Sequence, residues 1–591
     1  MIKQIKFFIV LCLLLVITVV AASAKTAPGK AQFSAQPVFS EAVAFDEIPA
    51  LREFARTAPL QLERPTVEDL IEIRPDRGPV AVDKGYSADG ALQAGGARLF
   101  QQSAALATTA APPTLANFEG LSNNDNFNLF DGRVNPPDTV GDVGRDHYVE
   151  MVNLAYAVYD KQGNLLLGPL AIGDLWQDFA IEDCTDPSGD PIVVYDQLVN
   201  RWILSQFTTR GFDDVTLPFY DCVAVSKTPD PTGPYYRYAF ITQPDTDAGF
   251  GYYFPDYPKY GVWTDSYLMT TRDFGVVNKY GISVYALEKA KMISGNPKAR
   301  AVQFFLDSDV VPLELLGDGL LPADIDGHRR PQARVAAPIV GTMDDDSNYG
   351  ATFDALNIWE LSVQWNSRAE ASLEFAGSFP VADFDSVFPC GPSSRDCLPQ
   401  PGITNPAQFL DVQSYRQRPL WRLAYRNFGD HEAMVTNQSV EALPGEAGVR
   451  WSELRRDNGQ YEVYQQGTYA PGDGVHRWMG SAAMDNKGNI ALGYSVVNGV
   501  DVYPGIRYTG RMAGDQLDMM TLDEGTIIDG SGVQTTTNSR WGDYTSMNVD
   551  PRDDCTFWYA NEYYTAEGQA SSAAGWQTRI ASFRMPDCKG K

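Results

Sequence analysis

The chain has 591 residues, a formal net charge of −28 at pH 7 and a sequence pI of about 4.5. This acidity argues against a nucleic-acid partner, because a phosphate backbone would be repelled. No apolar stretch beyond the first twenty residues is long enough to predict a stable membrane span.

The first 24 residues have the composition of an export signal. Two lysines precede an apolar run over residues 7–20, and "ASA" at 22–24 fits a cleavage site. Cys12 belongs to this segment, and the six cysteines that follow are an even number, as is typical of oxidising compartments. We therefore expect a signal peptide over 1–24 and a secreted protein, either extracellular or periplasmic.

The spacing of the six remaining cysteines favours disulfides between neighbours, although six cysteines allow fifteen connectivities. The expected pairs are Cys390–Cys397, Cys184–Cys222 and Cys555–Cys588. The chain has no C-x-x-C motif, which argues against zinc or iron–sulfur sites built on thiolates.

Residues 25–116 differ in composition from the rest of the chain. They are rich in Ala, Pro and Gln, with short charged pieces such as "PTVEDLIEIRPDRGP". Segments of this kind lack the apolar content needed for a core. We expect a poorly ordered leader or propeptide.

From residue 117 onward the sequence has an all-β texture and an internal repeat. In each copy an apolar strand ends in Asp, a turn follows, and a second apolar strand returns. Clear copies span 138–153, 190–207, 257–274, 476–495 and 541–563, and degenerate copies span 328–345 and 430–442.

Seven copies of a roughly four-stranded unit predict an all-β fold, a seven-bladed β-propeller over 117–591. Residues 118–130 would supply an outer strand that closes the ring. An array of two-sheet sandwiches is the alternative. A monomer is expected.

Aspartates recur at the turns of the repeat, namely Asp142, Asp196, Asp265, Asp485 and Asp550. A carboxylate at a strand end accepts backbone N–H bonds from the following turn. Recurrence in five copies indicates a structural role for these residues.

The starts of the repeated strands are expected to converge, because the first strand of each propeller blade lines the central channel. The residues at this register are Asp138, Asp190, Asp256, Lys259, His328, Arg329, Arg330, Asp430, His431, His476, Arg477, Arg540 and Asp543. Carboxylates, imidazoles and guanidinium groups together predict a functional site at the funnel mouth.

Three of the four histidines fall at this register in consecutive blades, namely His328, His431 and His476. Converging imidazoles would ligate a metal, or one would act as an acid or base near neutral pH. In the alternative, each histidine only binds the backbone of a neighbouring blade. His431 and His476 are catalytic candidates, and the separation of the three rings decides among these readings.

The carboxylates admit two chemistries. Asp190 and Asp543 are candidates for the acid and the base or nucleophile of a glycosidase. Asp256 and Asp430, with His328, are candidate ligands for a metal ion, and oxygen ligands of this kind suit Ca²⁺.

Cationic and aromatic side chains at the same register are expected to bind the substrate. Arg330, Arg477 and Arg540 carry planar forks suited to carboxylate or sulfate, and Lys259 adds a positive charge. Trp478 would stack on a sugar ring, with packing between blades as the alternative.

Four strings support a family resemblance: "PPDTVGD", "DPIVVYDQLVNRWILSQF", "HRWMGSAAMDNKGNIALGYS" and "RWGDYTSMNVDPRDDCTFWYANEYY". They resemble those of large exported bacterial proteins of propeller type, mostly of unassigned activity, which implies export and fold. At fold level the chain is also similar to the sialidase-like propellers, but their S-x-D-x-G-x-T-W box is absent.

Two functions follow as hypotheses. The first is an exported propeller that binds or cleaves an extracellular polysaccharide, possibly anionic, at the funnel mouth. If catalytic, it would be a lyase, with Arg neutralising a uronate while His or Tyr removes the α proton, or a hydrolase using two aspartates. The second is a non-catalytic surface or matrix module that binds a protein partner through loops such as 386–408.

Overall fold

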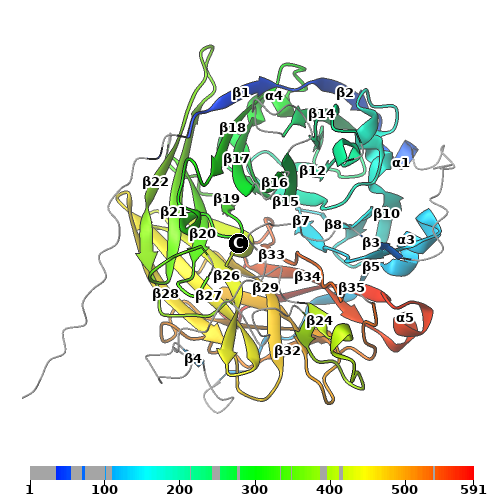
Figure 1. Cartoon of the computed structure of the whole chain (residues 1–591), viewed down its shortest axis with the longest axis vertical. Coiled ribbons are helices and arrows are strands. Elements are labelled where there is room, and N and C mark those ends of the chain that lie inside the picture. The colour runs from blue at the N-terminus through cyan, green and yellow to red at the C-terminus, as the bar shows by residue number, and fades with distance from the viewer. Residues whose placement is uncertain are drawn as a thin grey trace, which may run out of the picture.

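Antiparallel β-sheets surround a common centre in the computed structural model of the chain (Figure 1). The structure describes residues 33, 35–54, 70–72, 100–101, 109–212, 214–242, 253–275, 280–332, 335–347, 349–386, 396–411, 417–536 and 539–590. The expected signal peptide over 1–24 lies outside these residues.

The sheets follow one another along the chain. The first contains β7 (Val140–Val143), β8 (His147–Val152), β9 (Ala155–Asp160) and β10 (Leu165–Ala171). The second contains β11 (Ile192–Asp196), β12 (Arg201–Phe207), β13 (Tyr220–Ser226) and β14 (Tyr235–Ile241). The third contains β15 (Tyr253–Val262), β16 (Ser266–Gly275), β17 (Tyr280–Glu288) and β18 (Arg300–Asp307).

The next two units are joined into one larger sheet. One contains β19 (Leu321–Asp326), β20 (Ala337–Met343), β21 (Ala355–Gln364) and β22 (Glu370–Pro380). The other contains β25 (Leu420–Asn427), β26 (Glu432–Leu443), β27 (Glu446–Asp457) and β28 (Gln460–Tyr469). They are joined because β19 pairs with β25 in parallel.

The C-terminal sheets complete the ring. One contains β29 (His476–Met484), β30 (Ile490–Val497), β31 (Gly505–Arg511) and β32 (Gly525–Ile528). The other contains β33 (Ser546–Val549), β34 (Thr556–Tyr564), β35 (Trp576–Arg584) and β5 (Ala116–Ser122). The prediction that residues just after 117 supply a closing outer strand is confirmed by the pairing of β5 with β35.

Shorter elements connect and cover the sheets. Two-stranded pairs join β3 (Leu70–Glu72) to β6 (Arg133–Asn135) and β23 (Asp396–Leu398) to β24 (Leu410–Asp411). The α-helices are α1 (Leu51–Phe54), α3 (Asn123–Phe130), α4 (Lys289–Ile293) and α5 (Ala566–Ser571). The 3-10 helices are η2 (Ile172–Trp176), η3 (Glu182–Thr185), η4 (Arg210–Phe212), η5 (Leu313–Leu315) and η6 (Pro406–Gln408). None of the helices among the described residues has the length and hydrophobicity of a membrane-crossing segment.

Part of the segment expected to be a poorly ordered leader is built into the sheets. β1 (Val38–Glu41) pairs with β18, and β2 (Ala44–Ile48) pairs with β14, each as a fifth outer strand. Two residues at 100–101 form β4, which pairs with β28. The expectation of disorder is therefore wrong for residues 38–54, because these strands satisfy sheet edges that would otherwise be unpaired.

Packing on both faces of each sheet explains the continuous apolar runs of the repeat. All five residues of β11, "IVVYD", are buried, and so are six of the seven residues of β12. Strands covered on both faces lack the alternation of half-exposed strands.

Two predicted disulfides are confirmed, Cys184–Cys222 and Cys555–Cys588. Cys397 is disulfide-bonded as well, but its expected partner Cys390 lies outside the described residues.

The turn aspartates have the structural role predicted for them. Asp142 accepts backbone N–H bonds from Val143 and, across to the next sheet, from Tyr195 at 2.7 Å. Asp485 accepts such bonds from the turn that follows it, at 2.8 and 3.1 Å. These carboxylates fasten turns and join neighbouring sheets.

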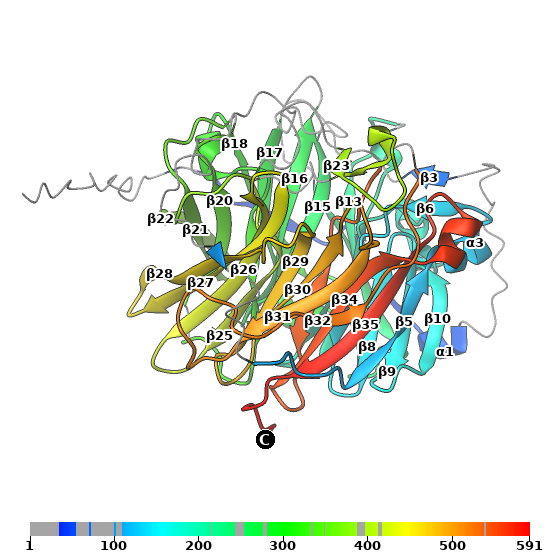
Figure 2. The ribbon, with the colours of Figure 1, turned by 90° about the horizontal axis from the view of Figure 1, so that it is seen from below.

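The first strand of each sheet lies nearest the centre, where it contacts the first strands of the neighbouring sheets (Figure 1), and β19 and β25 run parallel. Figure 2 shows the sheets from the side. These inner strands are β7, β11, β15, β19, β25, β29 and β33. We call the end at which they begin the strand-start rim and the end at which they finish the strand-end rim. The repeat predicted these strands correctly except for two sheets, where it matched the second strands, β20 and β26.

Candidate functional site

Loops that precede three inner strands bring three aspartates together at the strand-start rim. The backbone N–H of Asp543 donates to Oδ1 of Asp138 at 2.6 Å. The side chain of Asn153 joins the other two loops, since its amide donates to Oδ2 of Asp138 at 2.8 Å and its carbonyl oxygen accepts from the backbone of Asp190 at 3.0 Å. Asp138, Asp190 and Asp543 are all buried. Residues about 400 positions apart in the sequence thus form one site.

Two tyrosines and a lysine fill the space beside these aspartates. The hydroxyl of Tyr544 lies 3.1 Å from Oδ2 of Asp190 and 3.0 Å from the carbonyl oxygen of Pro258. The Lys259 ammonium lies 2.8 Å from the ring centroid of Tyr257 and 3.5 Å from that of Tyr544. Lys259 is 1% exposed, and its Nζ has no hydrogen-bond acceptor within the described part of the chain.

Two guanidinium groups flank Asp543. Arg418 is fully buried, with its guanidinium 3.6 Å from the ring centroid of Tyr257 and 3.9 Å from Oδ1 of Asp543. Arg540 lies 3.3 Å from Oδ2 of Asp543. Asp543 is therefore the carboxyl group of this site that has two guanidinium groups beside it.

Burial raises the pKa values of the other acids. Burial and the Asp543 charge raise the pKa of Asp138 to about 6, against the opposing effect of Arg540. Burial, followed by the charges of Asp256, Asp138 and Asp543, raises the pKa of Asp190 well above its ordinary value, against the opposing effect of Lys259. Asp190 is thus an acid of the cluster whose surroundings favour its neutral form.

Burial, with the nearby charge of Arg418, also lowers the pKa of Lys259 well below its ordinary value, although three aspartates oppose this shift. Asp256 lies at the edge of the same cluster, where it is half-buried and accepts from the backbone N–H of Tyr257 at 2.9 Å. The cluster formed by Asp138, Asp190, Lys259, Asp543, Tyr544 and Arg418 is called the central acid cluster below.

The structure therefore brings together several residues selected from the sequence: Asp138, Asp190, Asp256, Lys259, Arg540 and Asp543. Arg418, Tyr257 and Tyr544 were missed. Both tyrosines adjoin selected residues, so their sequence position was the available signal. Arg418 lies two residues before β25, the inner strand that the repeat did not detect, and no sequence signal marked it.

His476, Arg477 and Trp478 begin β29 but are used for packing. Arg477 is buried and forms salt bridges with Asp473 at 2.9 Å and Glu524 at 2.7 Å. Nδ1 of His476 accepts from the backbone N–H of Ala447 at 3.2 Å, and burial together with Arg477 lowers its pKa to about 4. Trp478 packs on Trp541, with ring centroids 5.2 Å apart.

The remaining candidates lie at the opposite rim. His328, Arg329 and Arg330 follow the end of β19, and Asp430 and His431 lie in the turn between β25 and β26. The expected convergence of His328, His431 and His476 is therefore wrong. The cause is the register error at these two sheets, because a residue that precedes the second strand lies at the end where the first strand finishes.

A buried ion cluster lies between the two rims. Arg422 of β25 binds Oδ2 of Asp324 at 2.7 Å and both oxygens of Asp326 at 3.0 and 2.7 Å. Arg422 is 2% exposed, and both aspartates are buried. The inner strands that the repeat missed therefore carry charges that neutralise one another, which explains why they lack the apolar pattern.

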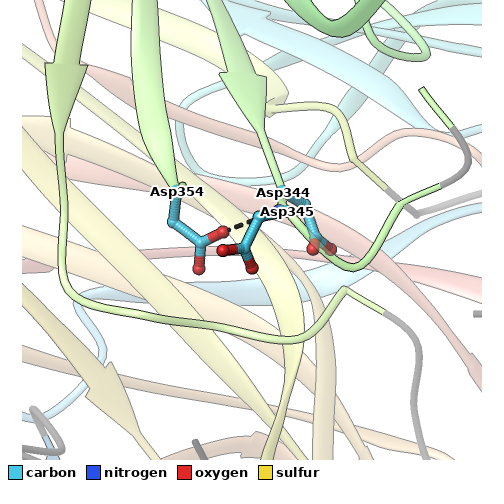
Figure 3. A group of neighbouring side chains, drawn as sticks. All are labelled: Asp344, Asp345 and Asp354. Carbon is cyan, nitrogen blue, oxygen red and sulfur yellow. Dashed lines mark hydrogen bonds between the residues drawn. The ribbon is translucent and has the colours of Figure 1, made fainter. Parts of the chain in front are cut away.

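One group of acids in the described residues has the spacing of a metal site, and it contains none of the predicted ligands Asp256, Asp430 and His328. Asp344, Asp345 and Asp354 place carboxylate oxygens within 4.8 Å of one another, near the ends of β20 and β21 (Figure 3). Backbone donors already serve this group, since Asp354 accepts from the Asp345 N–H at 2.9 Å and Asp344 accepts from the Ser386 N–H at 3.0 Å.

Protons also reduce the charge of this group. Burial raises the pKa of Asp344 to about 7, and burial with the Asp344 charge raises that of Asp354 to about 9. Asp345 and Asp354 join the two ends of the loop between β20 and β21.

Comparisons with known proteins give only distant similarities. No protein-family model matches the chain, and no curated protein matches it. Among solved structures, an endo-arabinase from Bacteroides thetaiotaomicron is similar at 13% identity and a TM-score of 0.25, over 55% of this chain and 94% of that one. An exo-β-1,3-galactanase from Clostridium thermocellum is similar at 11% identity and a TM-score of 0.29, over 80% and 97%.

The sialidase of Trypanosoma rangeli is similar at 9% identity and a TM-score of 0.27, over 66% of this chain and 54% of that one. The similarity to sialidase-like propellers predicted from the sequence is thus found among solved structures at the level of fold. Superpositions with such low TM-scores carry no argument about activity, substrate or site residues.

Proposed function

We propose that the chain is an exported seven-bladed β-propeller that binds and hydrolyses an extracellular polysaccharide at the strand-start rim. The observation that carries this proposal is the pairing of two unlike carboxyl groups in the central acid cluster. Burial raises the pKa of Asp190 well above its ordinary value, whereas Asp543 lies close to Arg418 and Arg540. Two carboxyl groups whose environments separate their protonation states are what glycoside hydrolysis needs.

In the proposed reaction Asp190 donates its proton to the glycosidic oxygen as the bond to the anomeric carbon breaks. A water molecule adds to that carbon and gives its proton to Asp543. Proton transfer back to Asp190 restores the starting state, so the net reaction consumes one water per bond cleaved.

The surrounding groups support this assignment of roles. Asp138 accepts from the Asp543 backbone and fixes the loop that carries Asp543. Tyr544 binds Asp190 and orients its carboxyl group. The lyase alternative is less well supported, because burial raises the pKa of Tyr257 and makes it a poor base. The predicted histidines do not reach the cluster and take no part in the proposal.

Export is supported by the N-terminal apolar run and by the disulfides Cys184–Cys222 and Cys555–Cys588. Disulfides persist in oxidising compartments. The protein-binding alternative relied on the loop at 386–408 as an exposed epitope. Its described part is anchored at one end, since Leu398 is fully buried and Gln400 donates to the carbonyl oxygens of Gln408 and Gln534, while residues 404–407 are exposed.

A screen for release of reducing ends from uronate-containing, sulfated and neutral polysaccharides tests the proposal. Asp190→Asn and Asp543→Asn should each lower turnover at least about a hundredfold while retaining binding. Asp160→Asn, in an exposed turn, is the matched control and should leave turnover unchanged. Binding without turnover in the unaltered protein would favour the non-catalytic alternative, and absence of both would refute the proposal.

A further inference from the structure

The strand-end rim carries a groove that the proposed function does not use. Two hollows of about 440 and 750 Å³ adjoin there and share Arg329 and Asn427 in their linings. The groove lies between the end of β19, the turn from β25 to β26, and the turn from β27 to β28. Volumes of this size are in the range of ligand sites. We call this surface the strand-end groove.

Most charges in the groove are neutralised by neighbours. Arg426 forms a salt bridge with Asp554 at 2.7 Å. Arg456 forms salt bridges with Glu432 and, at 3.4 Å, with Glu360. The Nδ1 atom of His431 lies 3.0 Å from its neighbour Asp430. Asp554, Glu432 and Glu360 are therefore occupied by arginines of the protein itself.

Two adjacent arginines are left over. Arg329 and Arg330 are exposed, and neither has a carboxylate partner among the residues that the structure describes. Asp430 and Asp457, both exposed, are the lining carboxylates without an arginine or lysine partner among the described residues. Arg329 and Arg330 are the guanidinium groups of the groove that no described carboxylate engages, so they can receive an oxyanion from a ligand.

The turn beneath these arginines holds them in place. The Arg329 guanidinium packs against Gly429, where an added Cβ would lie 1.5 Å from Nη1. The amide of Asn427 donates to the carbonyl oxygen of Arg330 at 2.8 Å, and its own oxygen accepts from the Gly429 N–H at 2.8 Å. Preorganised guanidinium forks bind oxyanions in bidentate fashion with less loss of entropy.

We infer that the strand-end groove binds an acidic oligosaccharide through its carboxylate or sulfate groups, at a site separate from the central acid cluster. Arg329 and Arg330 receive the oxyanions. Phe428, stacked on His431 with ring centroids 5.0 Å apart, supplies an apolar wall. A second site of this kind would hold an anionic polymer near the protein independently of catalysis.

Calorimetric titration with three probes tests the inference: an oligogalacturonate, a sulfated oligosaccharide and a neutral oligosaccharide of equal length. Either or both anionic probes should bind, and the neutral one should bind at least about tenfold more weakly. The affinity should fall as salt is raised, because the arginines are exposed. The two anionic probes distinguish carboxylate from sulfate as the preferred group.

Matched variants locate the binding. The double variant R329A/R330A should lose at least about tenfold in affinity, whereas R368A, at an exposed arginine without an ion pair among the described residues, should lose none. Gly429→Ala should weaken binding by displacing Arg329. Gly445→Ala is its control, because Gly445 also has a positive φ but no atom within 4 Å of an added Cβ.

The test separates this inference from the proposed function. Asp190→Asn should leave the affinity at the groove unchanged, and R329A/R330A should leave turnover of short substrates unchanged. Failure of both anionic probes to bind, or unchanged affinity in a folded R329A/R330A variant, would overturn the inference. A loss confined to Asp190→Asn would assign the binding to the central acid cluster instead.

Discussion

Replacing Leu51 with alanine should release the segment at 38–54 from the sheets. Leu51 is 1% exposed and packs in the main core, and its N–H donates to the carbonyl oxygen of Gly233 at 3.2 Å. Asp46 of the same segment accepts two hydrogen bonds of 2.7 and 2.6 Å from the buried Arg237. A buried Leu→Ala change costs about 2–5 kcal/mol. We take about 3 kcal/mol, because a segment at the edge relaxes partly around the cavity.

Limited trypsin digestion measures this change. A cost of about 3 kcal/mol raises the population of the released segment, and hence cleavage after Arg52, by about a hundredfold. Val43→Ala is the control, because Val43 is 48% exposed and its truncation should change cleavage less than about threefold. Equal cleavage rates in the two variants would refute the conclusion that this segment is a fixed part of the fold.

Three further predictions concern stability and the packed residues. Burial raises the pKa of Glu150 to about 7, so the native state binds the Glu150 proton more tightly than the unfolded state does. Glu150 therefore lowers the free energy of unfolding as the pH rises from about 4.5 to 7. In urea unfolding Glu150→Gln should stabilise the protein at pH 8 but not at pH 4, and equal effects at both pH values would contradict the shift. Removing the disulfide with C555S/C588S opens a loop of 33 residues and should cost about 4 kcal/mol in thermal or urea unfolding, whereas a cost below about 1 kcal/mol would be inconsistent with it. Arg477→Ala leaves Asp473 without its cation and Glu524 with Arg507 alone, and it should destabilise the protein by about 2 kcal/mol while turnover per folded molecule stays constant. A selective loss of turnover would return Arg477 to the substrate site.

Much of the fold and half of the site could be predicted from the repeat. Some inner strands are apolar and end in Asp, as β11 does with "IVVYD". For such a strand the sequence alone shows which residues precede it and therefore lie at the strand-start rim. Asp138, Asp190 and Asp543 were placed at one rim in this way, and the structure brings them into contact. The local sequence pattern was sufficient because each of these strands has the apolar run and the turn aspartate of the repeat.

The histidines were misplaced for a physical reason. β19 and β25, which pair side by side, carry Asp324, Asp326 and Arg422, whose charges are neutralised by one another between the two strands. A single strand of this kind has no apolar signature, so the repeat matched the next strand and moved His328 and His431 to the wrong rim. Whether such a segment forms an inner strand depends on contacts with distant segments, and sequence periodicity does not reveal those contacts.

The N-terminal strands were missed for a related reason. β1 and β2 are short, partly exposed edge strands, and they are stable only because β18 and β14 offer unpaired edges. Such pairing over more than 190 residues depends on the partner sheet and not on the segment's own composition. Arg418, which contributes its charge to Asp543 from a loop, could not be selected by periodicity either.

Turnover by the Asp190→Asn variant tests the central claim most directly. The account predicts that the unaltered protein cleaves the polysaccharide, with Asp190 as the proton donor and Asp543 as the base. Asp190→Asn should abolish this cleavage while thermal stability and substrate binding are preserved. Cleavage at an unchanged rate in a folded Asp190→Asn variant would contradict the assignment of the central acid cluster as the active site.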